Sequence, residues 1–386
     1  MKKLPLQIAL TGITGYARNY LESIKLTSPE KTELRAVTAI NRTEHEAFCA
    51  DLETSGAEVF TTYTDMINAW KGRIDLCALP VPIHLHLPMT LQALEADMNV
   101  VLEKPMAGSV EQGQAICDAA EGEKRIAIGF QDMYRPSTHK IAKELNQGRI
   151  GKITGVTMLT LWPRAQSYYQ RNNWAGAIEV NGHIVRDSPI NNATAHFVNL
   201  SLFFAGLPSG KIAKAQKVTA ELFRARDISS FDTAAIRILT DTGIPLHLYA
   251  THSCKENETA TVTVHGEKGT MTWVQGQHVE WKVEGSLEKI DIETMSETKE
   301  FMWNSVLDSL MDGSEFCCTP EMAMSHVELV ETLHRDHSIK DIETSFLTFE
   351  DSENDLKTYL PSMAADLKRC RDEKALPSEL NMAWAI

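Results

Sequence analysis

The chain has 386 residues, of which 43% are hydrophobic and 23% charged, and its formal net charge is -14. These fractions are ordinary for a globular protein and argue against wholesale disorder, while the length suits two domains with separate cores. The acidic balance argues against a nucleic-acid partner, which requires clustered Lys and Arg, and no apolar run approaches the roughly 18 residues that span a bilayer.

The cysteines and the start of the chain bear on its location. The seven cysteines are odd in number and contain no CxxC pair, a pattern that favours reduced thiols in a cytoplasmic protein. His and Cys show no close ligand spacing, so we expect no metal site. The basic, briefly apolar start runs into a glycine turn without a convincing small-residue cleavage site, which indicates a first strand and not a signal peptide.

Residues 6–128 alternate short apolar runs with helical periodicity, the pattern of a parallel sheet covered by helices. The predicted strands are Leu6–Leu10, Leu34–Ile40, Val59–Thr61, Leu76–Leu79, Val100–Leu102 and Ile126–Ile128. The predicted helices are Ala17–Ile24, Glu44–Leu52, Leu87–Ala96 and Glu111–Ala120. Because crossovers between parallel strands are right-handed, residues 1–128 are expected to form a doubly wound α/β sheet.

From residue 129 the pattern changes to one of successive strands joined by turn residues. A helix at Ser137–Leu145, a strand at Ile153–Trp162 and a helix at Pro189–Phe204 come first. The strands that follow are Lys217–Phe223, Thr233–Leu239, Pro245–His252, Thr259–His265, Thr270–Trp273 and Val279–Val283. The last predicted helices are Met302–Met311, Glu321–His334 and a charged one around Asp355–Arg371. Residues 129–386 are therefore predicted to be an α+β domain with a large, mostly antiparallel sheet.

A glycine-containing turn, Gly12-Ile13-Thr14-Gly15-Tyr16-Ala17, follows the first strand. Compared with G-x-G-x-x-G/A, it keeps the first glycine and the closing small residue but has Thr14 in the middle. Such a turn holds the pyrophosphate of a dinucleotide on backbone N–H groups at the start of a helix. The alternative is a generic turn between a strand and a helix.

Asn41 and Arg42 follow the second strand. An NAD site usually has Asp or Glu here to accept from the ribose 2′-hydroxyl, whereas Asn41 removes a carboxylate that would repel a 2′-phosphate. Arg42 could pair with that phosphate or stack on adenine. We therefore favour NADP over NAD. The alternative is a solvated Arg42 and a plain ribose bonded to Asn41.

Glu103-Lys104-Pro105 directly follows an apolar run, at the edge where open α/β sheets bind ligands. Lys104 is suited to stabilising a developing alkoxide, because desolvation and a cationic nicotinamide lower the pKa of a lysine. Pro105 could fix the turn through a cis peptide.

The loop after the fourth strand contains Pro80, Pro82 and His86. Prolines end the strand and shape a loop at the same edge of the sheet. We assign these residues to cofactor contacts or to structural support, and not to proton transfer.

A second group of polar residues begins the helix at Pro189. Asp187 or Ser188 can cap this helix, and Asn192 and His196, four residues apart, would share one face. A neutral imidazole directed at a substrate hydroxyl is a base near pH 7, so His196 is the candidate acid/base. The alternative is a capped helix with one core histidine.

Taken in this order, the motifs resemble the Gfo/Idh/MocA family of oxidoreductases over nearly the whole chain. The matching segments are the Gly12 turn, Pro82-x-x-x-His86, Glu103-Lys104-Pro105, Gly148-Arg149-Ile150-Gly151 and the helix with His196. The resemblance implies an N-terminal Rossmann domain and a C-terminal domain whose open sheet makes homodimer or homotetramer contacts. It also implies NAD(P)-linked oxidation or reduction of a sugar, cyclitol or related polyol, with Lys104 and His196 as the catalytic pair.

The chain departs from this family at one catalytic position. The family usually has Asp four residues before the histidine, and here Asn192 stands there. An amide can orient a hydroxyl but cannot take its proton. Either Lys104 and His196 suffice, or Asp187 has moved into the role.

Substrate determinants are expected in the segment that contains Arg164, Tyr168 and Trp174, together with Asp187 and Asn192. Aromatic faces suit the C–H surface of a sugar ring, while Arg and Asn suit hydroxyls or a carboxylate. The alternative is that these aromatic residues only pack between domains.

These features predict a cytoplasmic, oligomeric NAD(P)-dependent dehydrogenase that acts on CH–OH groups, without nucleic-acid or membrane partners. Two rivals stay open: a cofactor-bound sensor or transcriptional co-regulator, and a redox-neutral enzyme that cleaves glycosides while retaining NAD.

Overall fold

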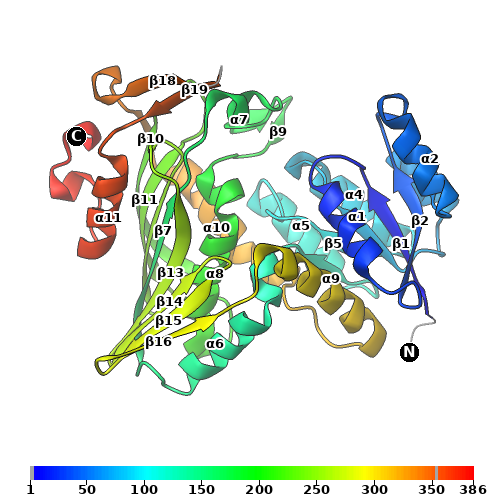
Figure 1. The fold of residues 1–386 in the computed structure, drawn as a ribbon, viewed down its shortest axis with the longest axis horizontal. Helices are drawn as coiled ribbons and strands as arrows, with labels where there is room; N and C mark the ends of the chain where they lie inside the picture. The colour runs from blue at the N-terminus through cyan, green and yellow to red at the C-terminus, as the bar shows by residue number, and fades with distance from the viewer. Residues whose placement is uncertain (1–3, 353–354) are drawn as a thin grey trace. The chain divides into compact units, whose positions relative to one another are not determined.

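The computed structural model describes residues 4–352 and 355–386. They form two compact units, one made of residues up to Pro136 together with Ser296–Met324, the other of Ser137–Met295 together with Ser325–Ile386 (Figure 1). The segment Ser296–Met324, assigned to the C-terminal domain from sequence, thus makes its contacts with the N-terminal part of the chain.

The first unit contains a six-stranded sheet in the order β3-β2-β1-β4-β5-β6, with every neighbouring pair parallel. Its strands are β1 (Leu6–Thr11), β2 (Thr32–Thr38), β3 (Glu58–Phe60), β4 (Leu76–Leu79), β5 (Asn99–Leu102) and β6 (Ile126–Ile128). Its helices are α1 (Ala17–Leu26), α2 (Glu46–Thr54), α3 (Tyr63–Ala69), α4 (His86–Glu95), α5 (Val110–Ala120) and most of α9 (Met295–Asp312). This strand order is that of a doubly wound dinucleotide-binding sheet, so the predicted fold class is confirmed.

Two details of this unit differ from the sequence analysis. Helix α3 was not predicted; its Thr62 side chain caps it by accepting from the Asp65 N–H, but seven residues are too few for a periodic signal. Strand β2 ends at Thr38 instead of Ile40, whose side chain is 80% exposed.

Helix α9 joins the first unit through contacts with α1. The rings of Trp303 and Tyr20 meet edge to face at 5.9 Å, and Lys299 donates to the Asn19 side chain at 2.6 Å. Further along, the Arg125 guanidinium donates to the Ser309 carbonyl at 2.8 Å. These contacts explain why the chain returns to this unit after more than 150 residues.

The second unit contains a nine-stranded sheet in the order β16-β15-β14-β13-β7-β12-β11-β10-β17. Its strands are β7 (Ile153–Leu161), β10 (Ala215–Arg224), β11 (Thr233–Thr240), β12 (Pro245–Thr251), β13 (Glu258–Gly266), β14 (Gly269–Val274), β15 (His278–Val283), β16 (Ser286–Asp291) and β17 (Ile339–Asp341). Only β7–β12 and β10–β17 pair in parallel, so the prediction of a large, mostly antiparallel sheet is confirmed.

The remaining elements are short hairpins and helices. The hairpins are β8 (Glu179–Val180) with β9 (His183–Ile184), and β18 (Thr348–Ser352) with β19 (Asp355–Tyr359). The helices are α6 (Pro136–Asn146), α7 (Gln166–Gln170), α8 (Ala195–Gly206), α10 (Pro320–Asp336) and α11 (Met363–Glu373). The predicted tail helix is therefore wrong in its first part, because Asp355–Tyr359 pairs with β18 as a strand. No helix within the described residues is long and apolar enough to cross a membrane.

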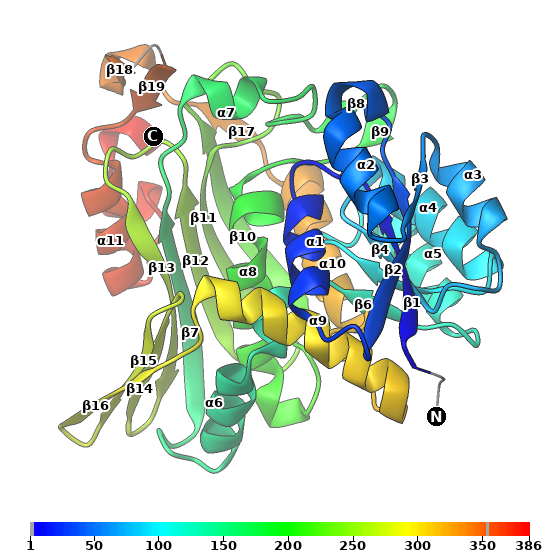
Figure 2. The same cartoon turned by 45° about the vertical axis from the view of Figure 1, so that its right-hand side comes forward.

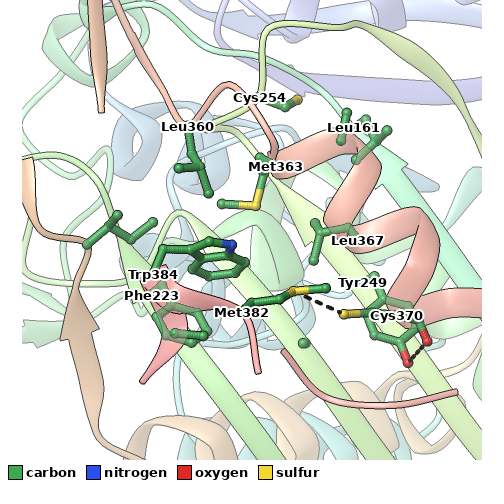
Figure 3. Packing of buried hydrophobic residues seen from close by; sticks show 14 of the residues in the cluster. Leu161, Phe223, Tyr249, Cys254, Leu360, Met363, Leu367, Cys370, Met382 and Trp384 are labelled. Carbon is green, nitrogen blue, oxygen red and sulfur yellow. Dashed lines mark hydrogen bonds between the residues drawn. The ribbon is translucent and has the colours of Figure 1, made fainter. Parts of the chain in front are cut away.

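The helices α8 and α11 cover opposite faces of the nine-stranded sheet (Figures 1 and 2). Successive residues of β7 alternate between these faces, and Leu159 and Leu161 face α11. Figure 3 shows Met363, Leu367 and Cys370 of α11 together with Leu161, and Leu159 belongs to the same cluster. This apolar layer makes the C-terminal segment part of the core of the second unit.

The helix predicted from Pro189 is interrupted. Pro189–Ala193 is a π-helical turn (η4), in which both the Thr194 N–H and its hydroxyl donate to the Pro189 carbonyl, at 2.8 and 2.9 Å. Helix α8 begins only at Ala195. Asn192 and His196 therefore do not share a single α-helical face, because Asn192 belongs to the wider turn. Such turns occur often at functional sites.

The α11 layer predicts a large effect of removing its central side chain. Leu367 is fully buried, so Leu367→Ala should lower the free energy of unfolding by about 2–5 kcal/mol through lost burial and a residual cavity. Arg369→Ala, at an exposed position of the same helix, should change it by less than about 0.5 kcal/mol. Urea unfolding of both variants measures the difference, and equal losses would contradict the packing role.

Candidate functional site

The Gly12 turn has the geometry of an anion cradle. Gly12 and Gly15 have φ of +93° and +57°, in the left-handed region that favours glycine. The Gly12 N–H donates to the Thr38 carbonyl at 2.9 Å, which ties the turn to β2. Thr14, Gly15 and Tyr16 are exposed, and α1 has no side-chain cap at its start. Since N-terminal N–H groups of a helix favour negative charge, the predicted turn fits a pyrophosphate.

The Asn41–Arg42 pair lies beyond β2, but Arg42 already has partners. Its guanidinium donates to the Val59 carbonyl at 3.0 Å and pairs with Glu53 at 2.8 Å. Asn41 donates to the exposed Glu44 carboxylate at 3.2 Å. A ligand phosphate would have to replace Glu53, and exposed pairs of this kind are worth only about 0–1 kcal/mol.

Glu103 is the best-defined polar residue of this unit. In β5, Leu102 lies opposite Leu79 of β4 and Ile128 of β6, so Pro80, Glu103 and Gly129 leave the sheet side by side. The Glu103 side chain is only 5% exposed, and it accepts from the Tyr20 hydroxyl at 2.8 Å and the Lys104 N–H at 3.2 Å. Burial raises the pKa of Glu103 to about 6, while the Tyr20 hydrogen bond and the Lys104 charge oppose the rise.

Tyr20 and Gly129 support this carboxyl, and sequence analysis did not find them. A Cβ at Gly129 would lie 2.8 Å from Glu103 Oε1, so only glycine leaves room for the carboxyl group. Tyr20 is separated from Glu103 by 83 residues and no local pattern connects the two. The available signal was a glycine placed directly after the apolar strand Ile126–Ile128.

His86 connects two loops at the same edge. Its ring nitrogens lie 2.9 Å from the Val81 carbonyl and 3.2 Å from the Met106 carbonyl, so it bridges the Pro80–Pro82 loop and the loop after Pro105. Burial lowers the pKa of His86 to about 4, and a neutral, enclosed imidazole is suited to support. The Lys104–Pro105 peptide is cis.

In the second unit, Asp187 orients Asn192. Asp187 is 2% exposed, and its two carboxylate oxygens accept from the Asn192 amide at 2.8 Å and the Gly176 N–H at 2.6 Å. The first bond identifies the nitrogen end of the Asn192 amide, since only that end donates. Asp187, which the sequence left open as a replacement for the family's Asp, is thus hydrogen-bonded to Asn192, the residue at that position.

His196 is the second residue of α8 and lies beside a group of aromatic rings. It is partly buried, its ring lies 6.4 Å from that of Phe197, and Phe197 meets Trp162 edge to face at 5.5 Å. Trp162 is fixed in turn, because its indole N–H donates to the Glu258 carbonyl at 3.1 Å. An imidazole beside these rings has a defined direction for proton transfer.

The predicted substrate residues gather around Tyr168. The guanidinium carbons of Arg164 and Arg171 lie 4.9 and 3.7 Å from the centre of its ring, and Arg171 lies 5.1 Å from the Trp174 ring. Burial, followed by the charge of Asp187, raises the pKa of Tyr168, so its hydroxyl remains a hydrogen-bond donor.

The predicted site residues thus form two groups. The first unit contains the Gly12 turn, Asn41–Arg42, the Pro80–His86 loop and Glu103-Lys104-Pro105. The second contains Arg164, Tyr168, Trp174, Asp187, Asn192 and His196. Among the described residues, no three or more His, Cys, Asp or Glu side chains gather as a metal site would require. All seven cysteines are thiols, six of them buried.

Comparison with known proteins identifies the family of this fold. The sequence model of the oxidoreductase family GFO_IDH_MocA, with an NAD-binding Rossmann fold, matches residues 6–130, and that of the GFO/IDH/MocA C-terminal domain matches residues 138–272. The chain therefore belongs to the GFO/IDH/MocA oxidoreductase family.

Three relatives show how far the similarity reaches. An inositol 2-dehydrogenase of Rubrobacter xylanophilus is 30% identical over 26% of this chain and 28% of its own. The D-glucoside 3-dehydrogenase of Escherichia coli is 24% identical over 56% of this chain and 58% of its own. The chain thus matches less than two thirds of either relative. The WlbA dehydrogenase of Bordetella pertussis has a TM-score of 0.68, with 24% identity over 86% of this chain and 95% of its own.

The buried Glu103 carboxyl predicts a pH-dependent loss of stability. Between about pH 4.5 and 6 the unfolded chain releases this proton while the folded protein retains it, so stability falls as pH rises through this window and levels off above it. The free energy of unfolding of Glu103→Gln lacks this pH dependence. Relative to that of wild type, it should therefore rise by about 2 kcal/mol between pH 4 and 7.

Unfolding free energies of wild type and Glu103→Gln at several pH values measure this gain. Glu111→Gln, at an exposed carboxyl of α5, is the charge-matched control. A difference between wild type and Glu103→Gln that stays constant across the range would show that the folded protein does not raise this pKa.

Proposed function

We propose that this protein is an NAD(P)-dependent dehydrogenase that transfers a hydride between nicotinamide and a CH–OH carbon of a sugar, cyclitol or related polyol. One observation carries the proposal. The Gly12 turn and Lys104 both stand at the carboxyl ends of strands of one parallel sheet in dinucleotide-binding order. A ligand held by the turn would cross that edge, which is where the chain places the lysine.

The residues of the chain have distinct proposed roles. Lys104 binds the substrate oxygen and stabilises the charge that develops on it. His196 takes the hydroxyl proton, and Asn192, oriented by Asp187, positions the hydroxyl. A dinucleotide whose pyrophosphate is held by the Gly12 turn would supply the nicotinamide as hydride acceptor. Asp187 then serves as a positioning residue, because its carboxylate is already occupied by two donors.

The names and ligands of the relatives support the substrate class. Two of them are dehydrogenases of inositol and of a glucoside, and the WlbA dehydrogenase was crystallised in complex with NADH and UDP-GlcNAcA. For the present chain, sugar or cyclitol chemistry is part of the proposal.

NADP is the proposed preference over NAD. Asn41 puts no carboxylate where the 2′-phosphate would lie, and Arg42 is close enough along the chain to pair with it. The ion pair between Arg42 and Glu53 is partly exposed, at 38% and 40%, so a phosphate with two charges can replace that carboxylate at small cost.

A cytoplasmic location and a homo-oligomer are also proposed. Buried thiols in place of disulfides suit a reducing compartment. On the sheet face that α11 packs against, Thr261 and Thr263 of β13 and Thr272 of β14 are only partly buried, and this half of the face could pair with a second copy.

Loss of Lys104 tests the reaction. Wild type should reduce NADP⁺ or NAD⁺ with at least one member of a panel of sugars, cyclitols and sugar acids. Lys104→Met should lower kcat by at least about a hundredfold, because the group that stabilises the alkoxide is gone. Absorbance of the reduced nicotinamide is the readout.

The control is Lys71→Met, at an exposed position of the same unit, which should keep wild-type activity. Dinucleotide binding is measured in parallel. If wild type binds the dinucleotide but reduces it with no member of the panel, the protein is not a dehydrogenase of this class. If Lys104→Met is as active as wild type, the lysine has no catalytic role.

Asn41→Asp tests the choice of dinucleotide. A new carboxylate beside the 2′-phosphate should weaken NADP⁺ binding at least about tenfold, while NAD⁺ gains an acceptor for its 2′-hydroxyl. Isothermal titration with both dinucleotides measures the ratio. Tighter binding of NAD⁺ than of NADP⁺ by wild type would contradict the proposed preference.

A further inference from the structure

A cavity of about 470 Å³ opens at one end of the nine-stranded sheet, entirely within the second unit. Its lining includes an indole, a guanidinium and three side-chain amides. These belong to Trp162, Arg164, Asn257, Gln275 and Gln277. One aromatic face and several neutral hydrogen-bonding groups are what a sugar ring requires.

The cavity shares a wall with the proposed acid/base. Trp162 lines the cavity and packs on Phe197, and Phe197 packs on His196. Two ring contacts thus connect the cavity wall to the imidazole.

Arg164 is held rigidly in the cavity wall. Its backbone N–H donates to the His252 carbonyl at 3.1 Å, and its own carbonyl accepts from Arg226 at 2.6 Å. The guanidinium lies between the Trp162 and Tyr168 rings, 5.7 and 4.9 Å from their centres. The hydrogen bonds fix the backbone of Arg164, and its guanidinium lies beside two aromatic rings.

The charge of Arg164 is not compensated. Within residues 4–352 and 355–386, neither Arg164 nor Arg171 forms an ion pair with a carboxylate. The nearest acid in the lining, Glu258, is paired with Lys368. The buried Arg226 is likewise paired with Asp232, at 3.0 Å.

The neighbouring ionisable groups do not neutralise the positive charge of Arg164. Asp187 is engaged by Asn192 and Gly176. Burial, and after it the charge of Arg164, holds the pKa of His252 well below its usual range, so His252 stays neutral. A partly buried guanidinium without a counter-ion is costly, and an anionic ligand removes that cost.

We propose that Arg164 binds an anionic group of the substrate in this cavity, so that the substrate is a sugar or cyclitol bearing a carboxylate or phosphate. This inference rests on the proposed dehydrogenase function. Arg164 is then a specificity residue, and Lys104 and His196 keep the chemistry.

Binding of matched sugars tests the inference without turnover. The full chain, saturated with reduced dinucleotide that can accept no hydride, is titrated calorimetrically with D-glucuronate, D-glucose 6-phosphate and D-glucose. At least one anionic sugar should bind about tenfold or more tighter than glucose, since a charge-assisted hydrogen bond is gained. The tighter of the two identifies the anion as carboxylate or phosphate.

Arg164→Gln should remove this preference, so that neither anionic sugar binds more tightly than glucose, and Arg164→Lys should restore part of it. Arg369→Gln removes the same charge from an exposed position paired with Glu373 and should keep the wild-type ratio. The inference is wrong if wild type binds glucose as tightly as both anions, or if Arg164→Gln retains the preference. If Arg164→Gln does not fold, the ratio of anionic-sugar to glucose affinity in wild type and in Arg164→Lys still tests the inference.

The two hypotheses fail separately. An anion preference that depends on Arg164, found in a protein that oxidises no sugar, would refute the dehydrogenase and leave the anion site. Oxidation of neutral sugars with no preference for anions would refute the anion site alone.

Discussion

The carboxyl group of Glu103, buried where β5 ends, is the constraint on which the first unit depends. A carboxyl group in that position is costly unless donors reach it. One donor is the Lys104 N–H, which the chain supplies locally, and the other is the Tyr20 hydroxyl from α1. The space for the group comes from Gly129, which has no side chain to fill it. Satisfying one buried group thus links β5, α1 and the end of β6, and the link fixes the backbone from which Lys104 projects.

The second unit also contains a buried carboxylate that is satisfied by donors from two segments. Asp187 is buried between the Gly176 loop and the π-helical turn, and it receives a backbone donor from one and the Asn192 amide from the other. The family's usual Asp is replaced here by Asn192, and the carboxylate that contacts Asn192 is that of Asp187. A buried carboxylate is therefore kept in contact with this position, while the residue at the position itself is neutral. A wider turn before α8 allows Asn192 to reach back to Asp187, which a regular helix from Pro189 would not.

Much of the fold could be predicted because its signals are local. Buried parallel strands are continuous apolar runs, and Leu76–Leu79 and Ile126–Ile128 were predicted to the residue. The charged pattern at Asp355–Tyr359 wrongly predicted a helix, because pairing with β18 makes this segment a strand. The place of Lys104 in the fold was predictable, because it directly follows a buried strand that ends at Leu102. Tyr20, Gly129 and the direction of the Asn192 amide were not, since they depend on contacts between distant segments or on a turn that propensity does not encode.

The contact between Trp303 of α9 and Tyr20 of α1 has a consequence for how the protein is made. During synthesis the six strands of the first sheet leave the ribosome long before α9, because the whole nine-stranded sheet apart from β17 lies between them in the chain. Until α9 is made, the side of Tyr20 that later contacts Trp303 is therefore uncovered in the newly made N-terminal part. It is completed only after most of the nine-stranded sheet has been translated, and until then its uncovered apolar surface is open to chaperones and to misassembly.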